Sequence, residues 1–151
     1  MLPTLCLVSV VESCEPPING HVIWDIERES DLVIEAKTSS KFTVVLRQIL
    51  RVAVYQLEFG NANDRSNTIT IMDTMVTETN TFDYTSANTN LFWVSWKNNV
   101  IATGAGGVPG ENEIIRLTDT KMGNGKPISI AEITTTDSNA RFKIFRGRCI
   151  P

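Results

Sequence analysis

The sequence predicts an all-β protein folded as a single antiparallel β-sandwich, jelly-roll or galectin-like, of about ten strands. Short segments rich in Val, Ile, Thr and aromatic residues recur along the chain, bounded by Gly, Pro, Asn, Asp or Ser. Many alternate apolar and polar residues, as Leu32 and Ile34 do against Asp31 and Glu35. A single open sheet would leave one apolar face in water, so two packed sheets are expected, each with one buried and one wet face.

The expected strands follow one another from end to end. In chain order they are His21–Ile26, Asp31–Lys37, Lys41–Arg47, Val52–Phe59, Asn67–Met72, Leu91–Lys97, Val100–Thr103, Glu113–Thr118, Ile128–Thr134 and Arg141–Phe145. The segment Gln48–Phe59 is the one arguable as a helix, but its Val, Tyr and Phe content and the missing cap favour a strand. The Thr- and Asn-rich segment Met75–Asn90 is expected to form a long surface loop or an edge hairpin.

Length and charge limit the classes of protein to consider. A chain of 151 residues with 42% hydrophobic residues suits one domain, which we place at residues 14–151. The formal charge of −3 gives no electrostatic reason to expect a nucleic-acid partner. No apolar segment approaches the roughly 20 residues that a bilayer-spanning helix needs, so no membrane insertion is expected.

Residues 1–13 have two open interpretations. Leu2–Val11 suits the apolar region of an export signal, with Val11 and Ser13 as the small residues before a cleavage at Cys14. Against this, no Lys or Arg precedes the apolar region, and Thr4–Val11 is rich enough in β-branched residues to be a first strand.

The cysteines follow the same alternatives. Removal of residues 1–13 would take Cys6 away and leave Cys14 and Cys149, placed to join the two ends of the domain by a disulfide. Closing so long a loop would stabilise the domain by roughly 4 to 5 kcal/mol in the chain-entropy model. The alternative is three buried, reduced cysteines in an intracellular protein.

The stretch FWVSWKNNVIATGAGG, Phe92–Gly107, ends in a glycine cluster after an apolar run. A nucleotide or S-adenosylmethionine loop needs a helix after the glycines. Here Pro109 interrupts the chain and the strand Glu113–Thr118 follows, so no cofactor is expected. We interpret the stretch as a hairpin that turns through Asn98 and Asn99 in type I′ geometry, followed by a flexible loop.

This stretch, with YQLEFGNANDRSNTITI before it and PISIAEITTTDSNARFKIF after it, resembles the domain family named after farnesoic acid O-methyltransferase. The resemblance covers about residues 31 to 145 and rests on the Phe-Trp-Val-Ser-Trp strand, its glycine-containing return, and Gly60, Asn61 or Asn63, Arg65 and Ser66. After Gly107 the sequence departs from the family's aromatic-rich pattern. The resemblance implies a secreted or extracellular β-sandwich module, whereas the chain offers no S-adenosylmethionine site to match the name.

Catalytic and metal sites are not expected. His21 is the only histidine, and it more plausibly opens a strand than serves a catalytic nucleophile. The three dispersed cysteines lack the spacing of a zinc site. None of the 17 acidic residues stands at a spacing that marks a pair for glycoside hydrolysis.

Aromatic and amide side chains near turns are the features that favour recognition. A tryptophan gives a flat face for a sugar ring, and asparagine and arginine give directional hydrogen bonds to its hydroxyls. The candidate residues for binding a carbohydrate or partner, expected at one end of the sandwich, are Asn61, Asn63, Arg65, Trp96, Asn98 and Asn99. The competing interpretation is that tryptophans, Trp24 and Trp93 included, fill the core, that asparagines shape turns, and that Arg65 pairs with Asp64 or Glu58.

These observations favour a non-enzymatic extracellular recognition module that binds a carbohydrate or a protein partner. One alternative is a structural or adhesion module that forms homo-oligomers through exposed edges or Cys6. A second, implied only by the family's name, is an enzyme or accessory protein of juvenile-hormone (farnesoic acid) metabolism.

Overall fold

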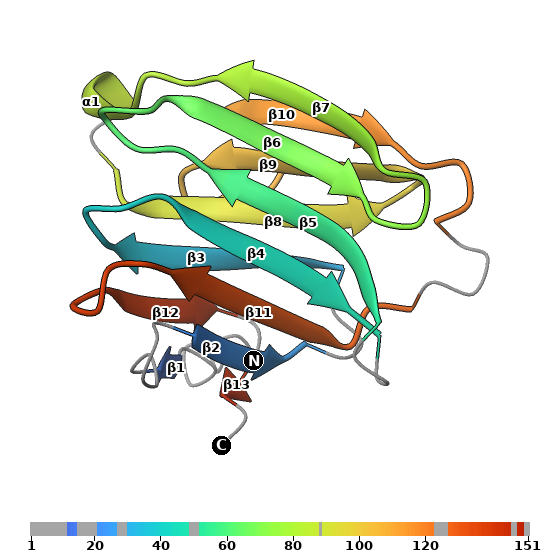
Figure 1. The fold of residues 1–151 in the computed structure, drawn as a ribbon, viewed down its shortest axis with the longest axis horizontal. Coiled ribbons are helices and arrows are strands. Elements are labelled where there is room, and N and C mark those ends of the chain that lie inside the picture. The colour runs from blue at the N-terminus through green and yellow to red at the C-terminus, as the bar shows by residue number, and fades with distance from the viewer. Residues whose placement is uncertain are drawn as a thin grey trace, which may run out of the picture.

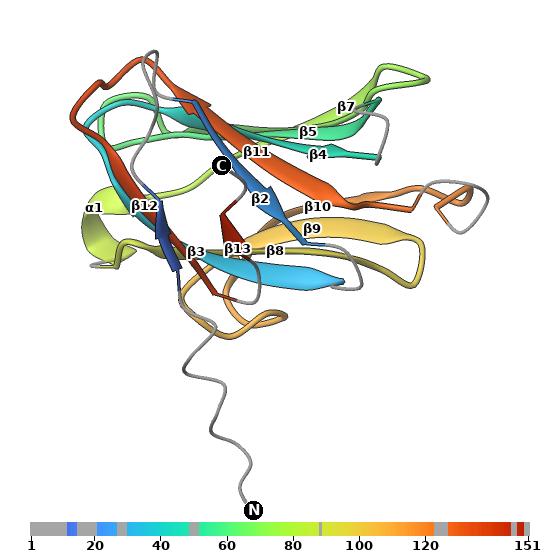
Figure 2. The same cartoon turned by 90° about the horizontal axis from the view of Figure 1, so that it is seen from below.

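The chain forms two antiparallel β-sheets that pack face to face, as Figure 1 and Figure 2 show. The computed structural model describes residues 12–14, 21–26, 30–48, 52–87, 89–122, 127–145 and 148–149. Within these ranges it confirms the predicted all-β sandwich. No helix among them is long and apolar enough to cross a membrane.

One sheet has six strands and the other seven. The six-stranded sheet has the order β1 (Glu12–Cys14), β12 (Arg141–Phe145), β3 (Asp31–Lys37), β8 (Leu91–Lys97), β9 (Val100–Ala105) and β10 (Glu113–Thr118). The seven-stranded sheet has the order β13 (Arg148–Cys149), β2 (His21–Asp25), β11 (Ile130–Thr135), β4 (Phe42–Arg47), β5 (Ala53–Phe59), β6 (Ser66–Ile71) and β7 (Val76–Thr81). A single helical turn, α1 (Tyr84–Ala87), lies between β7 and β8.

The expected strands are present, and four of them, β3, β8, β10 and β12, have the predicted bounds. The segment Gln48–Phe59 contains the strand β5, as its composition predicted. Of the two alternatives for Met75–Asn90, the edge hairpin is confirmed, because β7 pairs with β6 and ends the sheet. The candidate strand Thr4–Val11 lies outside the described residues.

The core between the sheets is built around a cluster of phenylalanines. Phe42 of β4 and Phe59 of β5 stack with ring centroids 4.6 Å apart. Phe92 and Phe142 of the opposite sheet contact Phe42 at centroid distances of 6.2 and 5.4 Å. Each large ring removes much apolar area from water, so this cluster holds the two sheets together near the end of the sandwich where β4 begins and β5 ends.

The six-stranded sheet also buries part of its outer face, which corrects the expectation of one wet face. Val33, Trp93 and Ala102 form a second apolar cluster there. The loop after β9 packs over it, and the Trp93 indole Nε1 donates a hydrogen bond of 2.7 Å to the carbonyl of Glu111. This loop was expected to be flexible, but it covers a buried tryptophan.

The glycine-containing hairpin is confirmed in detail. Asn98 and Asn99 have φ values of 55° and 63°, as a type I′ turn requires. The return strand β9 runs through Gly104 to Ala105, and a loop without a helix leads to β10. Gly104 lies directly beneath the Trp93 ring, where a Cβ atom would come within 2.2 Å of Cε2.

We expect Gly104→Ala to lower the free energy of unfolding by about 1–3 kcal/mol, because the added methyl forces Trp93 or the strand to shift. Gly107→Ala is the matched control, since its Cβ would only touch Leu91 Cδ1 at 3.5 Å. That variant should stay within about 0.5 kcal/mol of the wild type. Chemical denaturation followed by tryptophan fluorescence measures both, and equal effects would contradict the packing described here.

The predicted disulfide would join two sheet edges that lie side by side. Cys14 ends β1 and Cys149 ends β13, and Cα atoms of these strands approach within 8 Å of each other. The two side chains lie outside the described residues, so the bond stays a prediction. We expect nonreduced peptide mapping of protein from an oxidising compartment to link Cys14 to Cys149. A free thiol on Cys14 in that material would contradict it.

Candidate functional site

The outer face of the seven-stranded sheet carries rows of polar side chains. Phe42, Val44 and Leu46 of β4 point into the core, so the residues between them point outward. Residues opposite each other on antiparallel strands share a face. The register therefore aligns one outer row across five strands: Thr134, Thr43, Glu58, Thr68 and Thr79.

A second outer row runs beside the first and is Glu132, Val45, Gln56, Thr70 and Thr77. Arg47 donates to Glu132 Oε1 from Nε at 2.8 Å and from Nη2 at 2.6 Å, which neutralises a carboxylate that is only 7% exposed. The hydroxyls of Thr70 and Thr77 lie 3.1 Å apart. The face is therefore rich in hydroxyls, and this carboxylate has a paired cation.

The first row ends in a depression of about 520 Å³ between two loops. It lies on β4, β5 and β11 and is bordered by the loop before β4 and the loop after β5. All its lining residues are polar: Ser39, Ser40, Lys41, Thr43, Glu58, Asn61, Thr134, Thr135 and Thr136. This hollow is the candidate functional site.

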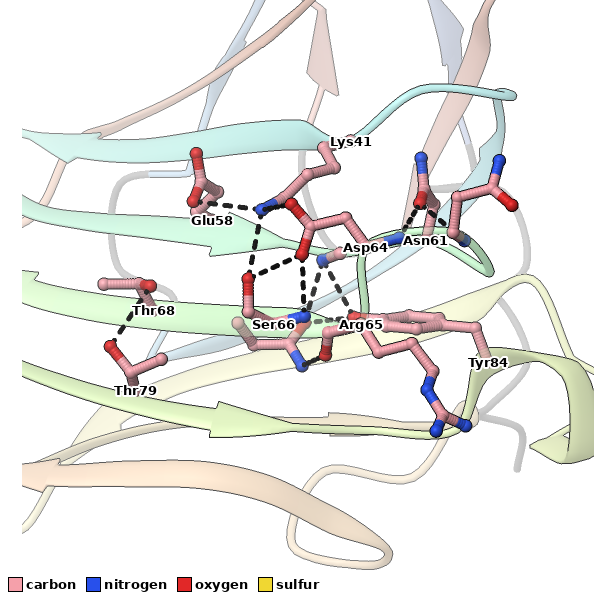
Figure 3. A network of polar contacts seen from close by, with 12 residues as sticks. Lys41, Glu58, Asn61, Asp64, Arg65, Ser66, Thr68, Thr79 and Tyr84 are labelled. Carbon is pink, nitrogen blue, oxygen red and sulfur yellow. Dashed lines mark hydrogen bonds and ion pairs between the residues drawn. The ribbon is translucent and has the colours of Figure 1, made fainter.

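Lys41 is the centre of the polar network at the depression (Figure 3). Its Nζ lies 3.4 Å from Glu58 Oε1, 3.1 Å from Asp64 Oδ2 and 3.3 Å from Ser66 Oγ. The Ser66 hydroxyl donates in turn to Asp64 Oδ1 at 2.8 Å. An ammonium has three donor hydrogens, and three acceptors surround this one. The formal charges of Lys41, Glu58 and Asp64 sum to −1, because one positive charge meets two negative ones.

The network shifts the pKa values of its charged groups. Burial alone would lower the pKa of Lys41, but the hydrogen bonds and charges of Asp64 and Glu58 outweigh it and raise that pKa. Hydrogen bonds from the Ser66 hydroxyl and from Lys41 lower the pKa of Asp64. Because the pKa of Lys41 is raised, its contribution to the stability of the folded state is lost only when the pH rises above that pKa. Because the pKa of Asp64 is lowered, its contribution is lost only when the pH falls below that pKa. The ion pair is therefore formed throughout the neutral range.

The loop between β5 and β6 is shaped by Asn61. Its Oδ1 accepts hydrogen bonds from the backbone N–H groups of Asn63 at 3.0 Å and Asp64 at 2.7 Å. Its Nδ2 donates to the carbonyl of Ser39 at 3.2 Å, which joins the two loops that border the depression. Asn61 is thus both a turn former and a lining residue.

Buried polar groups hold the same loop from below. Asn67 Oδ1 accepts from the backbone N–H of Gly60 at 2.9 Å and from the Tyr84 hydroxyl. Asn67 is only 2% exposed. Burial raises the pKa of Tyr84 to about 12, so its hydroxyl stays protonated and able to donate. The loop is fixed from both sides before any ligand arrives.

Arg65 does not face the depression. Its Nη1 lies 3.4 Å from Asp83 Oδ1, and both side chains are about half exposed. In Figure 3 its guanidinium extends away from Lys41. Arg65 therefore forms an ion pair, as the competing interpretation held, but its partner is Asp83 and not Asp64 or Glu58, both of which pair with Lys41.

The structure does not bring the sequence-predicted candidates together. The strand β8 begins beside the loops of the depression, where the N–H of Ala36 bonds the carbonyl of Asn90 at 2.8 Å. It then runs the length of the sheet, so Asn98 and Asn99 turn at the opposite end from Asn61, Asn63 and Arg65 (Figure 1). These two groups cannot form one site.

Trp93 and Trp96, the two tryptophans whose side chains the structure describes, are not placed for stacking on a ligand at the depression. Trp96 points into the core and is 7% exposed, which corrects its place among the candidates. Trp93 points the other way and is covered by its loop. The side chain of Trp24 lies outside the described residues.

Sequence reasoning missed the groups that line the depression. Three of them, Lys41, Thr43 and Glu58, fall within expected strands, and the sequence assigns them no function. Thr134 falls at the end of another expected strand, Ile128–Thr134, which is distant in the chain. Polar residues at alternate positions, Thr43 and Arg47 of β4 and Gln56 and Glu58 of β5, were the available signal for an outer face, and Val45 interrupts it. Nothing local indicated that β11 pairs with β4.

Comparison with known proteins shows the fold. No protein-family model and no curated protein sequence matches the chain. Lactose- and MES-liganded congerin II matches with a TM-score of 0.55 at 8% identity, over 81% of this chain and 95% of that chain. A tetrameric galectin from the ball sponge Cinachyrella sp. matches with a TM-score of 0.52 at 8% identity, over 93% and 99%.

The exoplasmic/lumenal domain of VIP36, in a form bound to Ca²⁺ and Man2, matches with a TM-score of 0.53 at 8% identity, over 91% of this chain and 81% of that chain. At such identities the likeness concerns the fold alone. The chain has a galectin-like β-sandwich, as the sequence predicted.

We expect Lys41→Met to raise the pKa of Asp64 toward that of an ordinary aspartate, because the variant removes the cation at 3.1 Å. Lys97→Met is the control, since Lys97 lies 3.6 Å from Asp31 at the other end of the sandwich. A carboxyl NMR titration of Asp64 measures both variants. An unchanged Asp64 pKa in Lys41→Met would show that the ion pair is not formed in solution.

Proposed function

We propose that this chain is a non-enzymatic carbohydrate-binding module whose ligand lies in the depression around Lys41, Thr43 and Glu58. The observation that carries the proposal is the preformed polar hollow on the outer face of the seven-stranded sheet. The fold likeness to a lactose-liganded congerin and to a Man2-bound lumenal domain supports it. Binding is argued from the site, because a fold alone does not fix a function.

The chemistry of the depression suits a hydroxyl-rich ligand. Thr43 and Thr134 can each donate and accept a hydrogen bond, and the half-exposed Glu58 carboxylate can accept from sugar hydroxyls. Lys41 binds the Glu58 carboxylate and Asn61 joins the two bordering loops, so Glu58 and these loops lose little conformational freedom on binding. The excess of one negative charge disfavours sulfated or carboxylated sugars and favours a neutral glycan.

The polar lining also limits the strength of binding. No aromatic side chain is among the residues that line the depression. Stacking of a sugar ring on an aromatic face would contribute additional affinity, and here hydrogen bonds must supply most of it. We therefore expect weak affinity at a single site.

Recognition fits the carboxylates better than catalysis does. Glycoside hydrolysis needs one carboxyl group whose pKa is raised so that it can act as an acid. Here the pKa of Asp64 is lowered, and Glu58 shares the same Lys41 ammonium. The Asp64 carboxylate is therefore suited to accept hydrogen bonds and not to act as the acid.

The setting of the module is part of the proposal. The neighbours in fold include an exoplasmic/lumenal domain, and the sequence resembles the extracellular family named after farnesoic acid O-methyltransferase. We propose a secreted or extracellular location on these grounds. An enzyme of juvenile-hormone metabolism gains no support from the depression.

The test is a glycan array of the full chain, followed by calorimetry with the glycan that binds. We expect Thr43→Val with Thr134→Val, and separately Glu58→Gln, to weaken binding at least about tenfold, or about 1.4 kcal/mol. Asn99→Gly is the matched control, because this turn lies at the opposite end and glycine accepts its positive φ. No bound glycan on the array, or equal affinity in all variants, would refute the proposal.

A further inference from the structure

The strand β7 is a long, exposed edge of the seven-stranded sheet (Figure 1). All six of its residues are exposed. Its sequence, VTETNT, contains no Lys or Pro, which are residues that natural proteins place on edges to prevent pairing. The edge therefore lacks these usual means of blocking a further strand.

The other edges of the described strands are shorter or partly covered. The strands β1 and β13 have three and two residues. The strand β10 lies beside β7, and its Ile114 carbonyl accepts a hydrogen bond of 2.8 Å from Asn80 Nδ2. Among the edge strands whose burial is described, β7 is the one in which all six residues are exposed, whereas Ile114 and Ile115 of β10 are buried.

The register with β6 shows which main-chain groups of β7 face outward. The N–H of Phe82 donates to the carbonyl of Arg65 at 3.0 Å, so this pair is hydrogen-bonded. Hydrogen-bonded pairs alternate along antiparallel strands, which directs the main-chain groups of Thr77, Thr79 and Thr81 away from β6. The Thr81 N–H is capped by Asn80 Oδ1 at 2.9 Å. The outward donors are those of Thr77 and Thr79.

We propose that β7 pairs antiparallel with β7 of a second copy of this chain, with Thr79 on the two-fold axis. In this register the two Thr79 residues exchange N–H···O=C bonds with each other. The Thr77 N–H of each copy donates to the Thr81 carbonyl of the other, and the Asn80 cap is undisturbed. The outward main-chain groups of β7 can pair with any extended strand whose groups have the same spacing. The β7 strand of a second copy has this spacing, because its sequence is identical.

Electrostatic repulsion between glutamates favours this register over the one shifted by two residues. A shift that pairs Thr77 with Thr79 of the second copy places Glu78 directly opposite Glu78, and like charges opposite each other are destabilising. With Thr79 on the axis, Glu78 faces Asn80 of the second copy, an amide that cannot repel it. The threonine hydroxyls of the two strands also continue the polar outer face without interruption.

The symmetry of this pairing has a functional consequence that rests on the proposed function. A two-fold axis perpendicular to a continuous sheet leaves the outer faces of both copies on the same side. Both depressions then face one surface. Two weak sites held this way bind a multivalent glycan surface far more strongly than one site does.

The first experiment is sedimentation velocity of the full chain over a concentration series without any glycan. We expect a reversible dimer in the wild type and in Thr79→Val, which keeps the outward N–H. Thr79→Pro removes that N–H without removing a bond to β6, and we expect at least about a tenfold weaker dimer. A monomer at every concentration, or a dimer that Thr79→Pro leaves unchanged, would overturn the pairing.

Cysteine cross-linking tests the register without relying on the proline variant. Thr79→Cys places the two thiols opposite each other on the axis, within the Cα separations that a disulfide allows. Thr77→Cys is the control, because it faces residue 81 of the second copy. The tryptic peptide of residues 66–97 holds no native cysteine, so its disulfide-linked dimer reports the contact. Linked peptides in both variants, or in neither, would overturn the register, whereas failed glycan binding with an intact dimer would refute only the proposed function.

Discussion

Phe42 and Phe59 stand opposite each other in the β4–β5 register and stack between the sheets, where Phe92 of β8 contacts both rings. Side chains alternate along a strand, so a register slip of one residue would turn a ring to water and bring Thr43 or Glu58 into the core. An unpaired carboxylate buried there would be strongly unfavourable. The outward direction of the candidate site is therefore set by the aromatic rings beneath it.

The same cluster reaches the loops of the depression through Tyr84. Its ring lies 5.8 Å from that of Phe92, and its hydroxyl bonds Asn67, which also accepts from the N–H of Gly60. From the outer side, Lys41 binds Asp64 of the same loop. The loop is thus held between an apolar core and a charged network. A binding surface built this way depends on packing that lies well away from any ligand.

The sequence predicted what local patterns determine. Alternation over Asp31–Lys37 and Leu91–Lys97 set the strands and their bounds, and the paired asparagines set the turn. The depression could not be predicted, because Thr43 and Thr134 meet only through the pairing of β4 with β11, whose partners are distant in the chain. Trp96 was misplaced because a tryptophan suits either a ligand face or a core, and only the second sheet decides between them. The strand β7 was predicted only as one of two alternatives for Met75–Asn90, because its polar residues form no apolar face that would distinguish an edge strand from a loop.

Asn80 shows how the open side of the sandwich is organised. Its Nδ2 binds the carbonyl of Ile114 on β10, and its Oδ1 caps the N–H of Thr81, so one side chain joins the edges of both sheets. This closes the gap between the layers but leaves the middle of β7 open. A lysine at position 77 or 79 would have been enough to discourage pairing there. Threonine instead keeps the edge uncharged on the outer face, and Glu78, the one charge of the strand, restricts which register a partner strand can take.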